Sequence, residues 1–343
     1  MANIAPTDIL DLVNLTLREL GRLRFSQIAQ NLQDYEIFSH WFRRDKVSFD
    51  SGVGIQRTLM NKLSNGAGHV GLMQTDNVDI VDVIDQLQLN WVHVQNSWGF
   101  IYQETLMNRG EALIANVLEP RRADCLISLV EELENKAWAS PAVGNTTEPF
   151  GVPHWIVKGA TGFNGGYPGS HPTIANVSIT DSPNFQNYTD QYTSLSKADA
   201  VKKLRTAHRK TGFKSPITIQ DYRGTTGQRY RLYVNETTIS GLEEVGEAQN
   251  ENLGRDLASM DGTITFRNHP IIWVPKLDSD SDDPIYGIDH STFYPVCLQG
   301  DYLRESEAQA SPSQHNVFQV FVDLSYNYLC VDRRRNWVIA TGT

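Results

Sequence analysis

The sequence predicts an α+β fold, and three observations indicate it. Residues 108–139 carry the longest helical pattern of the chain, with apolar side chains recurring every three or four positions. Two extended runs precede it, at 47–60 and 77–95, in which apolar and polar residues alternate as in half-buried strands. From residue 216 onward, short β-branched and aromatic runs are separated by Gly, Pro and Asn. Helices and strands that are grouped rather than regularly alternating are typical of α+β proteins.

Composition places the chain among ordinary soluble proteins with two or three subdomains. It has 343 residues, of which 40% are hydrophobic and 20% charged. The formal net charge of −10 argues against a protein whose task is to coat nucleic acid, because such domains carry a basic excess. No apolar run approaches the ~18 residues of a bilayer span, and the first residues lack a signal-peptide pattern. We therefore expect a chain that is made in the cytoplasm and does not enter a membrane.

The first 46 residues are predicted to form a mostly helical, locally basic arm. Apolar residues recur at helical spacing from Ile9 to Leu20, and Arg18 and Arg22 belong to a group of six Lys and Arg residues. Two interpretations stay open. The basic residues form a solvated helix face, or the arm docks onto an acidic surface of a neighbouring copy.

Residues 47–97 are predicted to form a long β-hairpin. Its first strand, with Val53 and Ile55 on it, would run from 47 to 60 and reach roughly 40 Å. A glycine-rich tip follows at 61–75, and the returning run alternates best from Leu87 to His93. Because an isolated two-stranded ribbon is marginally stable in water, we expect it to need a partner, most simply another copy of the chain.

The helical pattern at 108–139 is predicted to be a spine. Asn108 is placed to cap its start, and Ser140-Pro141 ends it, because the residue before proline leaves helical geometry. Pro120 lies in the middle of this pattern, where it removes a backbone donor. A kink or a restart of the helix is therefore expected there. The predicted apolar face consists of Leu126, Ile127, Val130, Leu133 and Ala137.

The remaining chain is predicted to be a loop-rich segment followed by strands. Residues 141–195 are rich in Gly, Pro, Asn, Ser and Thr, and a short helix is expected from Lys197 to Arg209, with Ser196 as its cap and Gly212 at its end. A weaker helix is expected at 242–257. Strands are expected at 217–221, 229–235, 263–266, 271–274, 317–324, 328–331 and 337–340.

Two motifs resemble ligand sites without completing them. Gly66, Gly68 and Gly71 spell GxGxxG, but an extended run follows where a nucleotide fingerprint needs a helix. The run from Asp278 to Asp289 matches several positions of a calcium loop, yet Asp283 stands where the sharp turn needs glycine. The prediction is a glycine tip and a solvated acidic turn. A metal- or nucleotide-binding enzyme is kept as a remote alternative.

Nothing else in the sequence indicates catalysis. The nine histidines show no HExxH spacing, and Ser194-x-x-Lys197 lacks the companion motifs of a serine nucleophile. The three cysteines are far apart and are expected to be structural thiols. Arg333, Arg334 and Arg335 suit salt bridges at an interface at least as well as phosphate contacts. We therefore expect no enzyme activity, no cofactor and no metal.

The order of these elements, together with several local stretches, resembles a known family. The stretches are 101–114, Arg121-Arg122-Ala123, Phe150–Val157, Gly162–Gly166 and Asp332–Trp337. With them, the chain resembles the major capsid proteins of tailed bacteriophages, which share the Hong Kong 97-like fold. The resemblance covers nearly the whole chain, and no single motif is diagnostic.

The resemblance implies a domain division and a function. It implies self-assembly into hexamers and pentamers of an icosahedral phage head that encloses double-stranded DNA without sequence-specific binding. It also implies portal, scaffolding and decoration proteins as partners, a place in the virion, and assembly in the host bacterial cytoplasm. The alternative is an encapsulin-like compartment shell. The implied parts are an N-terminal arm (1–46), an E-loop hairpin (47–97), a peripheral domain (98–215) with the spine helix, an axial domain (216–310) and C-terminal strands (311–343).

The residues expected at subunit interfaces come from the arm, the hairpin and the arginine run. Some members of the family link a lysine of the E-loop covalently to a neighbour, and Lys62 is the sole lysine between 47 and 97. We expect no such crosslink here. The interface candidates are Arg18, Arg22, Val53, Ile55, Lys62, Gly66, Gly68, Gly71, Arg333, Arg334 and Arg335.

Overall fold

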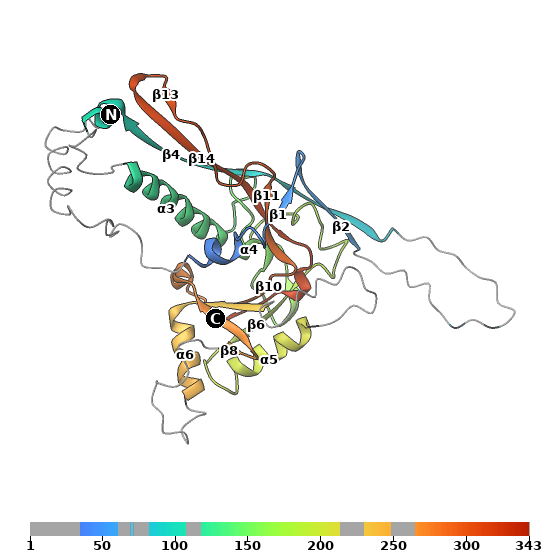
Figure 1. The fold of residues 1–343 in the computed structure, drawn as a ribbon. Coiled ribbons are helices and arrows are strands. Elements are labelled where there is room, and N and C mark those ends of the chain that lie inside the picture. Colours follow the sequence, from blue (N-terminus) through green and yellow to red (C-terminus); the bar gives the residue numbers. More distant parts are fainter. Residues whose placement is uncertain are drawn as a thin grey trace. The chain divides into compact units, whose positions relative to one another are not determined.

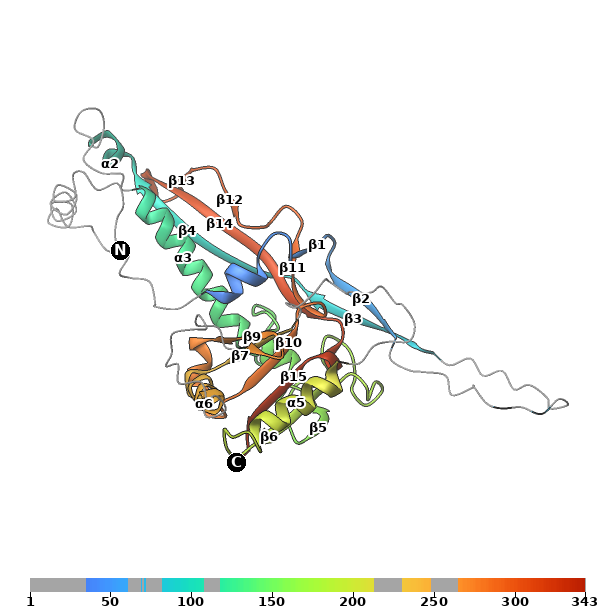
Figure 2. The same cartoon turned by 60° about the horizontal axis from the view of Figure 1, so that its bottom comes forward.

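The protein forms a mixed α/β structure that divides into two compact units (Figures 1 and 2). One unit holds the described parts of 93–133 and 300–325, and the other holds those of 34–92, 134–299 and 326–343. The domain boundaries expected at 46, 97, 215 and 310 stay predictions. The structure is a computed structural model that describes residues 35–60, 69, 71, 82–107, 118–212, 230–247 and 265–342.

The smaller unit is built on one long strand. Strand β14 (Gln314–Cys330) pairs with β4 (Val92–Ile101), β12 (Arg304–Glu305) and β13 (Gln309–Ser311). A short helix, α2 (Tyr102–Met107), follows β4, and the longer α3 (Leu118–Ala137) runs beside β4 and β14 in Figures 1 and 2. Asn96 on β4 donates a hydrogen bond to the carbonyl of Cys125 on α3 at 2.8 Å, which ties the helix to the strands.

The spine helix is present, and its buried stripe coincides with the predicted one at Leu133 and Ala137 but lies one position away before them. Leu133 and Ala137 are buried as predicted, whereas Leu126, Ile127 and Val130 are half-buried. The fully buried line recurs every four residues. The sequence pattern allowed either stripe. The apolar members of that line are Cys125, Leu129, Leu133 and Ala137.

Pro120 is the third described residue of α3, and Leu118 and Glu119 before it are helical as well. A kink or restart of the helix at Pro120 stays a prediction, because residues 108–117 lie outside the described residues. The predicted start at Asn108 lies outside the described residues, and the helix ends at Ala137, just before Ser140-Pro141.

The larger unit contains a seven-stranded sheet with β10 at its centre. All five residues of β10 are buried, and the strand is antiparallel to both neighbours, β15 and β7. The strands are β5 (Gly162–Gly165), β6 (Asn187–Tyr192), β15 (Trp337–Thr341), β10 (Ile285–Asp289), β7 (Tyr230–Val234), β9 (His269–Trp273) and β8 (Thr265–Phe266), in spatial order.

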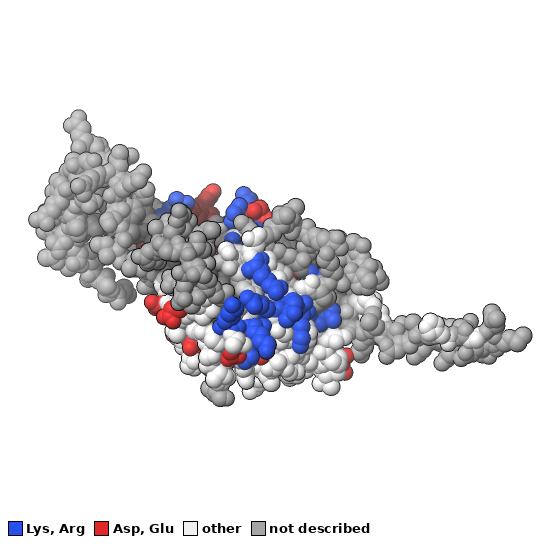
Figure 3. Space-filling view, turned by 90° about the horizontal axis from the view of Figure 1, so that it is seen from below, with Lys and Arg blue, Asp and Glu red and all other residues white. Residues whose placement is uncertain are grey.

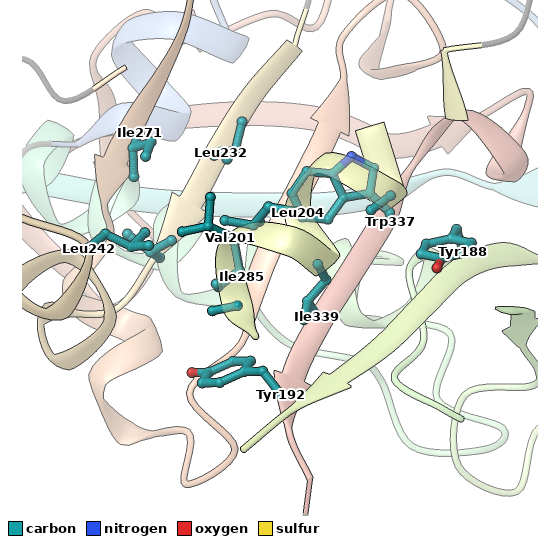
Figure 4. Close-up of a cluster of buried hydrophobic side chains, with 13 residues drawn as sticks. Tyr188, Tyr192, Val201, Leu204, Leu232, Leu242, Ile271, Ile285, Trp337 and Ile339 are labelled. Carbon is teal, nitrogen blue, oxygen red and sulfur yellow. The ribbon is translucent and has the colours of Figure 1, made fainter. Parts of the chain in front are cut away.

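Helices α5 (Ala200–Thr211) and α6 (Glu236–Glu247) pack on one face of this sheet (Figure 4). Helix α5 buries Val201 and Leu204 against Leu232, Ile285 and Ile339 of the strands. The predicted end of α5 at Gly212 is confirmed, but its N-cap is Asp199 rather than Ser196. Helix α6 begins at 236, six residues before the predicted start.

The opposite face of the sheet carries an aromatic cluster around Trp41. This residue ends a one-turn π-helix, η1 (Ile37–Trp41), and is 1% exposed. Its indole N–H donates to the Tyr233 hydroxyl at 2.8 Å. We call these residues the Trp41 cluster: Trp41, Trp138, Tyr233, His290, Phe293 and Tyr328, with ring centroids 5.2–5.9 Å from that of Trp41.

A second sheet region joins β1 (Ser48–Asp50) and β11 (Phe293–Leu298) to the end of β14. Cys297 and Cys330 lie on these strands, and both are buried and unpaired, as is Cys125. Burial raises the pKa of the Cys297 thiol to about 12. The expectation of structural thiols is confirmed.

Most of the predicted strands of the C-terminal half are confirmed. They appear as β7, β8, β9, β14 and β15, although the strand expected at 328–331 is the end of the longer β14. Strands β10 and β11 were not predicted, and the strand expected at 217–221 lies outside the described residues. Among the described helices, none is both long and apolar enough to cross a bilayer.

Candidate assembly surface

The predicted hairpin is confirmed as a separate two-stranded ribbon. Strands β2 (Gly54–Met60) and β3 (Ile84–Asn90) pair in antiparallel register, from Gly54 opposite Asn90 to Met60 opposite Ile84. One face of the ribbon is buried within its own unit through Ile55, Leu87 and Leu89. Ile55 is 1% exposed, so the expectation that it faces a neighbouring subunit is wrong.

The first predicted strand, 47–60, is interrupted. It forms β1 and β2, which join different sheets, with a break at Ser51-Gly52-Val53. Gly52 has a φ of +118°, a conformation that side chains other than hydrogen disfavour, and its carbonyl accepts a hydrogen bond from the Trp91 indole at 2.9 Å. Val53 at this break is fully exposed, with 101% relative accessibility. It stays an interface candidate.

The returning run also contains a break. Leu87 and Leu89 are buried on β3, and the next buried residue is Val92 on β4, so the alternation shifts by one position at Trp91. His93, which was expected to continue the pattern of the leucines, is exposed and hydrogen-bonds to the Ser325 hydroxyl.

The other face of the ribbon is exposed and ends in an apolar pair. Met60 and Ile84 lie opposite each other and are 59% and 61% exposed. The positions before them on the same face are polar, among them the directly opposed Thr58 and Gln86. Met60 and Ile84 therefore form an apolar cross-strand pair that the described residues leave exposed. The pair lies where the described part of the ribbon ends. We call Met60 and Ile84 the ribbon pair.

Most other candidates from the arm and the tip lie outside the described residues. These are Arg18, Arg22, Lys62, Gly66 and Gly68. Gly71 is described and exposed, and an added side chain there would meet no atom within 4 Å.

Arg333 is a core residue, so its predicted role at an interface is wrong. It begins a short 3-10 helix, η5 (Arg333–Arg335), and its side chain is 0% exposed. Burial lowers its pKa to about 10. Its guanidinium donates to the carbonyls of Trp155 (2.6 Å), Phe185 (2.8 Å), Gly165 (3.0 Å) and Gly166 (3.2 Å), and to the Asn187 side-chain oxygen (3.0 Å).

The acceptors of Arg333 explain three of the stretches that carried the family resemblance. Trp155 lies in 150–157, Gly165 and Gly166 lie in 162–166, and Arg333 lies in 332–337. At Gly165, an added Cβ would lie 1.8 Å from Asn187 Oδ1, so this close approach requires glycine. These distant stretches converge on one buried cation, which fixes the loop-rich segment to the sheet.

His154 lies in the same region and predicts acid sensitivity. It is 0% exposed, stacks on Phe150 at 4.0 Å, and its pKa is lowered to about 3, first by burial and then by His171 and Arg333. In the unfolded chain the His154 imidazole is therefore protonated below pH ~6.5, whereas in the folded chain it stays neutral there. The free energy of unfolding is unaffected by this group above that pH, and below it falls by about 1.4 kcal/mol per pH unit, or ~2 kcal/mol by pH 5.

In the wild type, the Ser140 hydroxyl hydrogen-bonds to His154 Nδ1 at 3.2 Å. His154→Asn places an amide near that hydroxyl and removes the imidazole that titrates. Urea unfolding at pH 7 and pH 5 measures both proteins. We expect the variant to lose less stability than the wild type on acidification, by about 2 kcal/mol. Part of the decline remains, because burial also lowers the pKa of His40 to about 3 and of His208 to about 4. An equal decline in both proteins would contradict the assignment to His154.

Arg334 and Arg335 are held by carboxylates of their own unit. Arg334 lies 3.7 Å from Asp332, and Arg335 lies 3.5 Å from Asp332 and 3.9 Å from the buried Asp289. Their side chains are 41% and 21% exposed, so both reach the surface and their interface role stays a prediction.

The acidic run is a turn, as predicted, but three of its carboxylates have protein partners rather than being only solvated. Lys158 binds Asp280 at 2.7 Å and Asp282 at 2.9 Å, and Asp278 accepts hydrogen bonds from the Glu236 N–H and the Trp273 indole. A 3-10 turn and a strand flank this run, rather than the two helices of a calcium loop. Across the described ranges, no group of three His, Cys, Asp or Glu residues is arranged to hold a metal ion.

One charged surface was missed by the sequence reasoning. Figure 3 shows Lys and Arg side chains gathered on the face seen from below, where α5 lies. Residues 197–212 hold six basic residues and one acidic residue, in a chain whose net charge is −10. A count of Lys and Arg against Asp and Glu along the predicted helix would have predicted this basic surface.

Comparison with known proteins identifies the fold. No family model and no curated protein matches the chain. Among solved structures, a subunit of the cyanophage A-1(L) capsid asymmetric unit matches with a TM-score of 0.62 and 13% identity, covering 95% of this chain and 98% of that one. The capsid of Myoviridae phage XM1 matches with a TM-score of 0.55 and 11% identity over 95% and 98% of the two chains. The capsid of a native GTA particle matches with a TM-score of 0.52 and 14% identity over 95% and 97%. The chain therefore has the phage capsid protein fold that its order of elements predicted.

Proposed function

We propose that this chain is a major capsid protein that self-assembles into the icosahedral head of a tailed bacteriophage. The observation that carries the proposal is a fold match along 95% of the chain to subunits that come from assembled capsids. The ribbon supports it, because Val53 and the ribbon pair expose apolar surface that an adjacent subunit would cover. Hexamers, pentamers, portal, scaffolding and decoration partners, and assembly in the host cytoplasm belong to this proposal.

The proposed mechanism is geometric and requires no catalysis. The inner face of the ribbon is buried in its own unit, and its β3 edge is held there by the hydrogen bond from the Gln88 N–H to the Ala175 carbonyl at 3.0 Å. The outer face and its apolar end then lie over a neighbour. Each contact contributes only ~25 cal/mol per Å² of apolar area, but a closed shell repeats it in every copy. Double-stranded DNA is enclosed without sequence-specific binding.

Electron microscopy of the purified protein tests the proposal. We expect closed shells of uniform diameter, whereas an ordinary enzyme, including the remote metal- or nucleotide-binding alternative, would give small particles. The contents of shells made in the native host separate a phage head from an encapsulin-like compartment. Nuclease-protected DNA supports the head, and a single co-purifying enzyme in place of DNA would contradict it.

Substituting the ribbon pair with charges tests the proposed contact. In Met60→Lys/Ile84→Glu, two opposite charges replace two apolar side chains on directly opposed positions, so the net charge is unchanged and the cross-strand pair is kept. We expect folded subunits with a circular dichroism spectrum like that of the wild type. The yield of closed shells should fall at least about tenfold, since a loss of about 1.4 kcal/mol per contact already gives that factor.

Thr58→Lys/Gln86→Glu is the matched control. It introduces the same charge pair one step along the same exposed face of the ribbon. Shell yield, measured by sedimentation and microscopy, should stay within about twofold of the wild type for this control. Equal yields for the two variants would show that the ribbon pair is not the contact.

A further inference from the structure

Helix α5 divides cleanly into a buried apolar side and an exposed basic side. Ala200, Val201, Leu204 and Ala207 are buried in the core of the larger unit (Figure 4). The exposed side carries Lys202, Arg205, Arg209 and Lys210, with Lys197 just before the helix. We call these five residues the α5 basic face. The helix itself contains no acidic residue.

Contacts within the described residues leave most of this charge uncompensated. Lys203, at the border of the face, pairs with Asp199 at 2.6 Å. None of the five residues of the α5 basic face forms an ion pair with a described carboxylate. Lys210 lies over the Tyr188 ring at 5.2 Å, and Arg209 donates to the carbonyl of Arg205, so both side chains are held in place beside the helix.

The chemistry of the face favours a polyanion over a protein partner. The core of a protein interface is enriched in aromatic and apolar residues and depleted in lysine. Of the exposed large hydrophobic residues of the described chain, Val53, Met60 and Trp273 lie on other elements, and Phe163, which is 38% exposed, packs on the Tyr188 ring that Lys210 also contacts. The α5 basic face therefore offers five cations with one partly exposed aromatic ring near its border, a composition that suits contact with a phosphate backbone.

The spacing of the cations suits a duplex. Lys202, Arg205 and Arg209 recur at intervals of three and four, which places them on one side of the helix. From Lys202 to Arg209 the helix rises ~10 Å, and a duplex carries one phosphate charge per ~1.7 Å of its axis, or roughly six over that length. Arginine adds a planar fork that can bind a phosphate through two N–H groups.

We propose that the α5 basic face contacts the phosphate backbone of the enclosed double-stranded DNA, so that α5 faces the interior of the shell. This inference rests on the proposed function. The chain as a whole is acidic and repels DNA, and a local basic face in every subunit offsets that repulsion at the inner wall. The contact is independent of sequence, because it is made to phosphates alone.

Fluorescence anisotropy of unassembled full-length subunits with a short labelled duplex tests the contact. The variant is Lys202→Gln/Arg205→Gln/Arg209→Gln. The control is Arg44→Gln/Lys276→Gln/Arg304→Gln, which removes three exposed charges from other surfaces. Between about 50 and 200 mM salt, the slope of log affinity against log salt should become shallower by roughly 2.7 for the variant, at ~0.9 per lost phosphate contact. The control should keep the wild-type slope.

Equal slopes in variant and control, or no duplex binding by the wild type, would overturn the proposal. A polyglutamate probe that binds with the same dependence on this face, while the duplex does not, would assign the face to an acidic protein instead. Circular dichroism verifies that both triple variants are folded.

Lysine labelling of assembled shells tests the orientation independently. A bulky amine-reactive reagent that is too large to enter the shell should modify Lys202 in unassembled subunits and spare it in shells, as read by mass spectrometry. Modification of Lys202 in intact shells would place α5 outside and overturn the proposal. Failure of the wild type to form any shell would instead contradict the proposed function, and the salt slopes would still report on the DNA contact.

Discussion

Replacing Arg333 with alanine is expected to lower the free energy of unfolding of the unassembled subunit by about 3–5 kcal/mol. The side chain is fully buried and supplies five hydrogen bonds, four of them to backbone carbonyls. Its removal takes the Arg333 donors away from these acceptors, although the Asn187 side-chain oxygen keeps the Val157 N–H at 3.0 Å. Each buried carbonyl that is left unsatisfied costs about 1–3 kcal/mol. Urea unfolding followed by circular dichroism measures the difference.

Two further variants separate the geometry of this side chain from its charge. Arg333→Lys keeps the charge, but one ammonium cannot span acceptors that the planar guanidinium reaches together, so we expect a loss of roughly 2 kcal/mol or more. Arg334→Ala changes the next arginine in the same turn, which is 41% exposed, and should cost less than about 1 kcal/mol. Similar losses for Arg333→Ala and Arg334→Ala would show that Arg333 does not organise the loop-rich segment.

Replacing Trp41 with alanine is expected to lower the free energy of unfolding by ~3–5 kcal/mol in the same urea assay, because truncating a large buried aromatic side chain leaves a cavity. Trp41 contacts five other aromatic rings, and its indole N–H satisfies the buried Tyr233 hydroxyl, which also hydrogen-bonds to His290 at 2.9 Å. The substitution therefore leaves a cavity between η1 and the sheet and removes a donor from a buried hydroxyl. Circular dichroism is the suitable readout, because the loss of a tryptophan changes fluorescence by itself.

Trp273→Ala is the control for this prediction, since it deletes the same side chain at a position that is 40% exposed. We expect a loss of no more than about 1.5 kcal/mol there. Trp41→Phe keeps an aromatic ring and removes the N–H donor, and should lie between the two. If Trp41→Ala is no more destabilising than Trp273→Ala, the Trp41 cluster is not the packing centre described above.

The elements that follow from local pattern could be predicted from the sequence. Alternation gave the ribbon, helical spacing gave the spine and α5, and Gly212 marked the end of α5. The order of these elements, together with several local stretches, carried the resemblance that predicted the capsid protein fold. Local pattern carries this information because strand and helix periods are properties of consecutive residues.

The wrong predictions concern residues whose burial or pairing depends on contacts with residues far away in the sequence. Nothing in Arg333-Arg334-Arg335 distinguishes a buried arginine from two surface ones, because the acceptors of Arg333 lie about 150 or more positions earlier in the chain. The interruption of the first strand depends on β1 pairing with β11, and β11 itself was not predicted. Ile55 was predicted to lie at an interface because strand alternation shows which face is apolar but not what covers it. The structure buries Ile55 within its own unit.

The three buried thiols give each unit its own chemical reporter. Cys125 lies in the smaller unit, and Cys297 and Cys330 lie in the larger one. Burial raises the pKa of all three, so they react with a thiol reagent chiefly when the surrounding structure opens. The modification rate at Cys125, compared with that at Cys297, therefore reads the opening free energy of one unit against the other. The same measurement on free subunits and on shells would show which unit gains protection on assembly, without any introduced label.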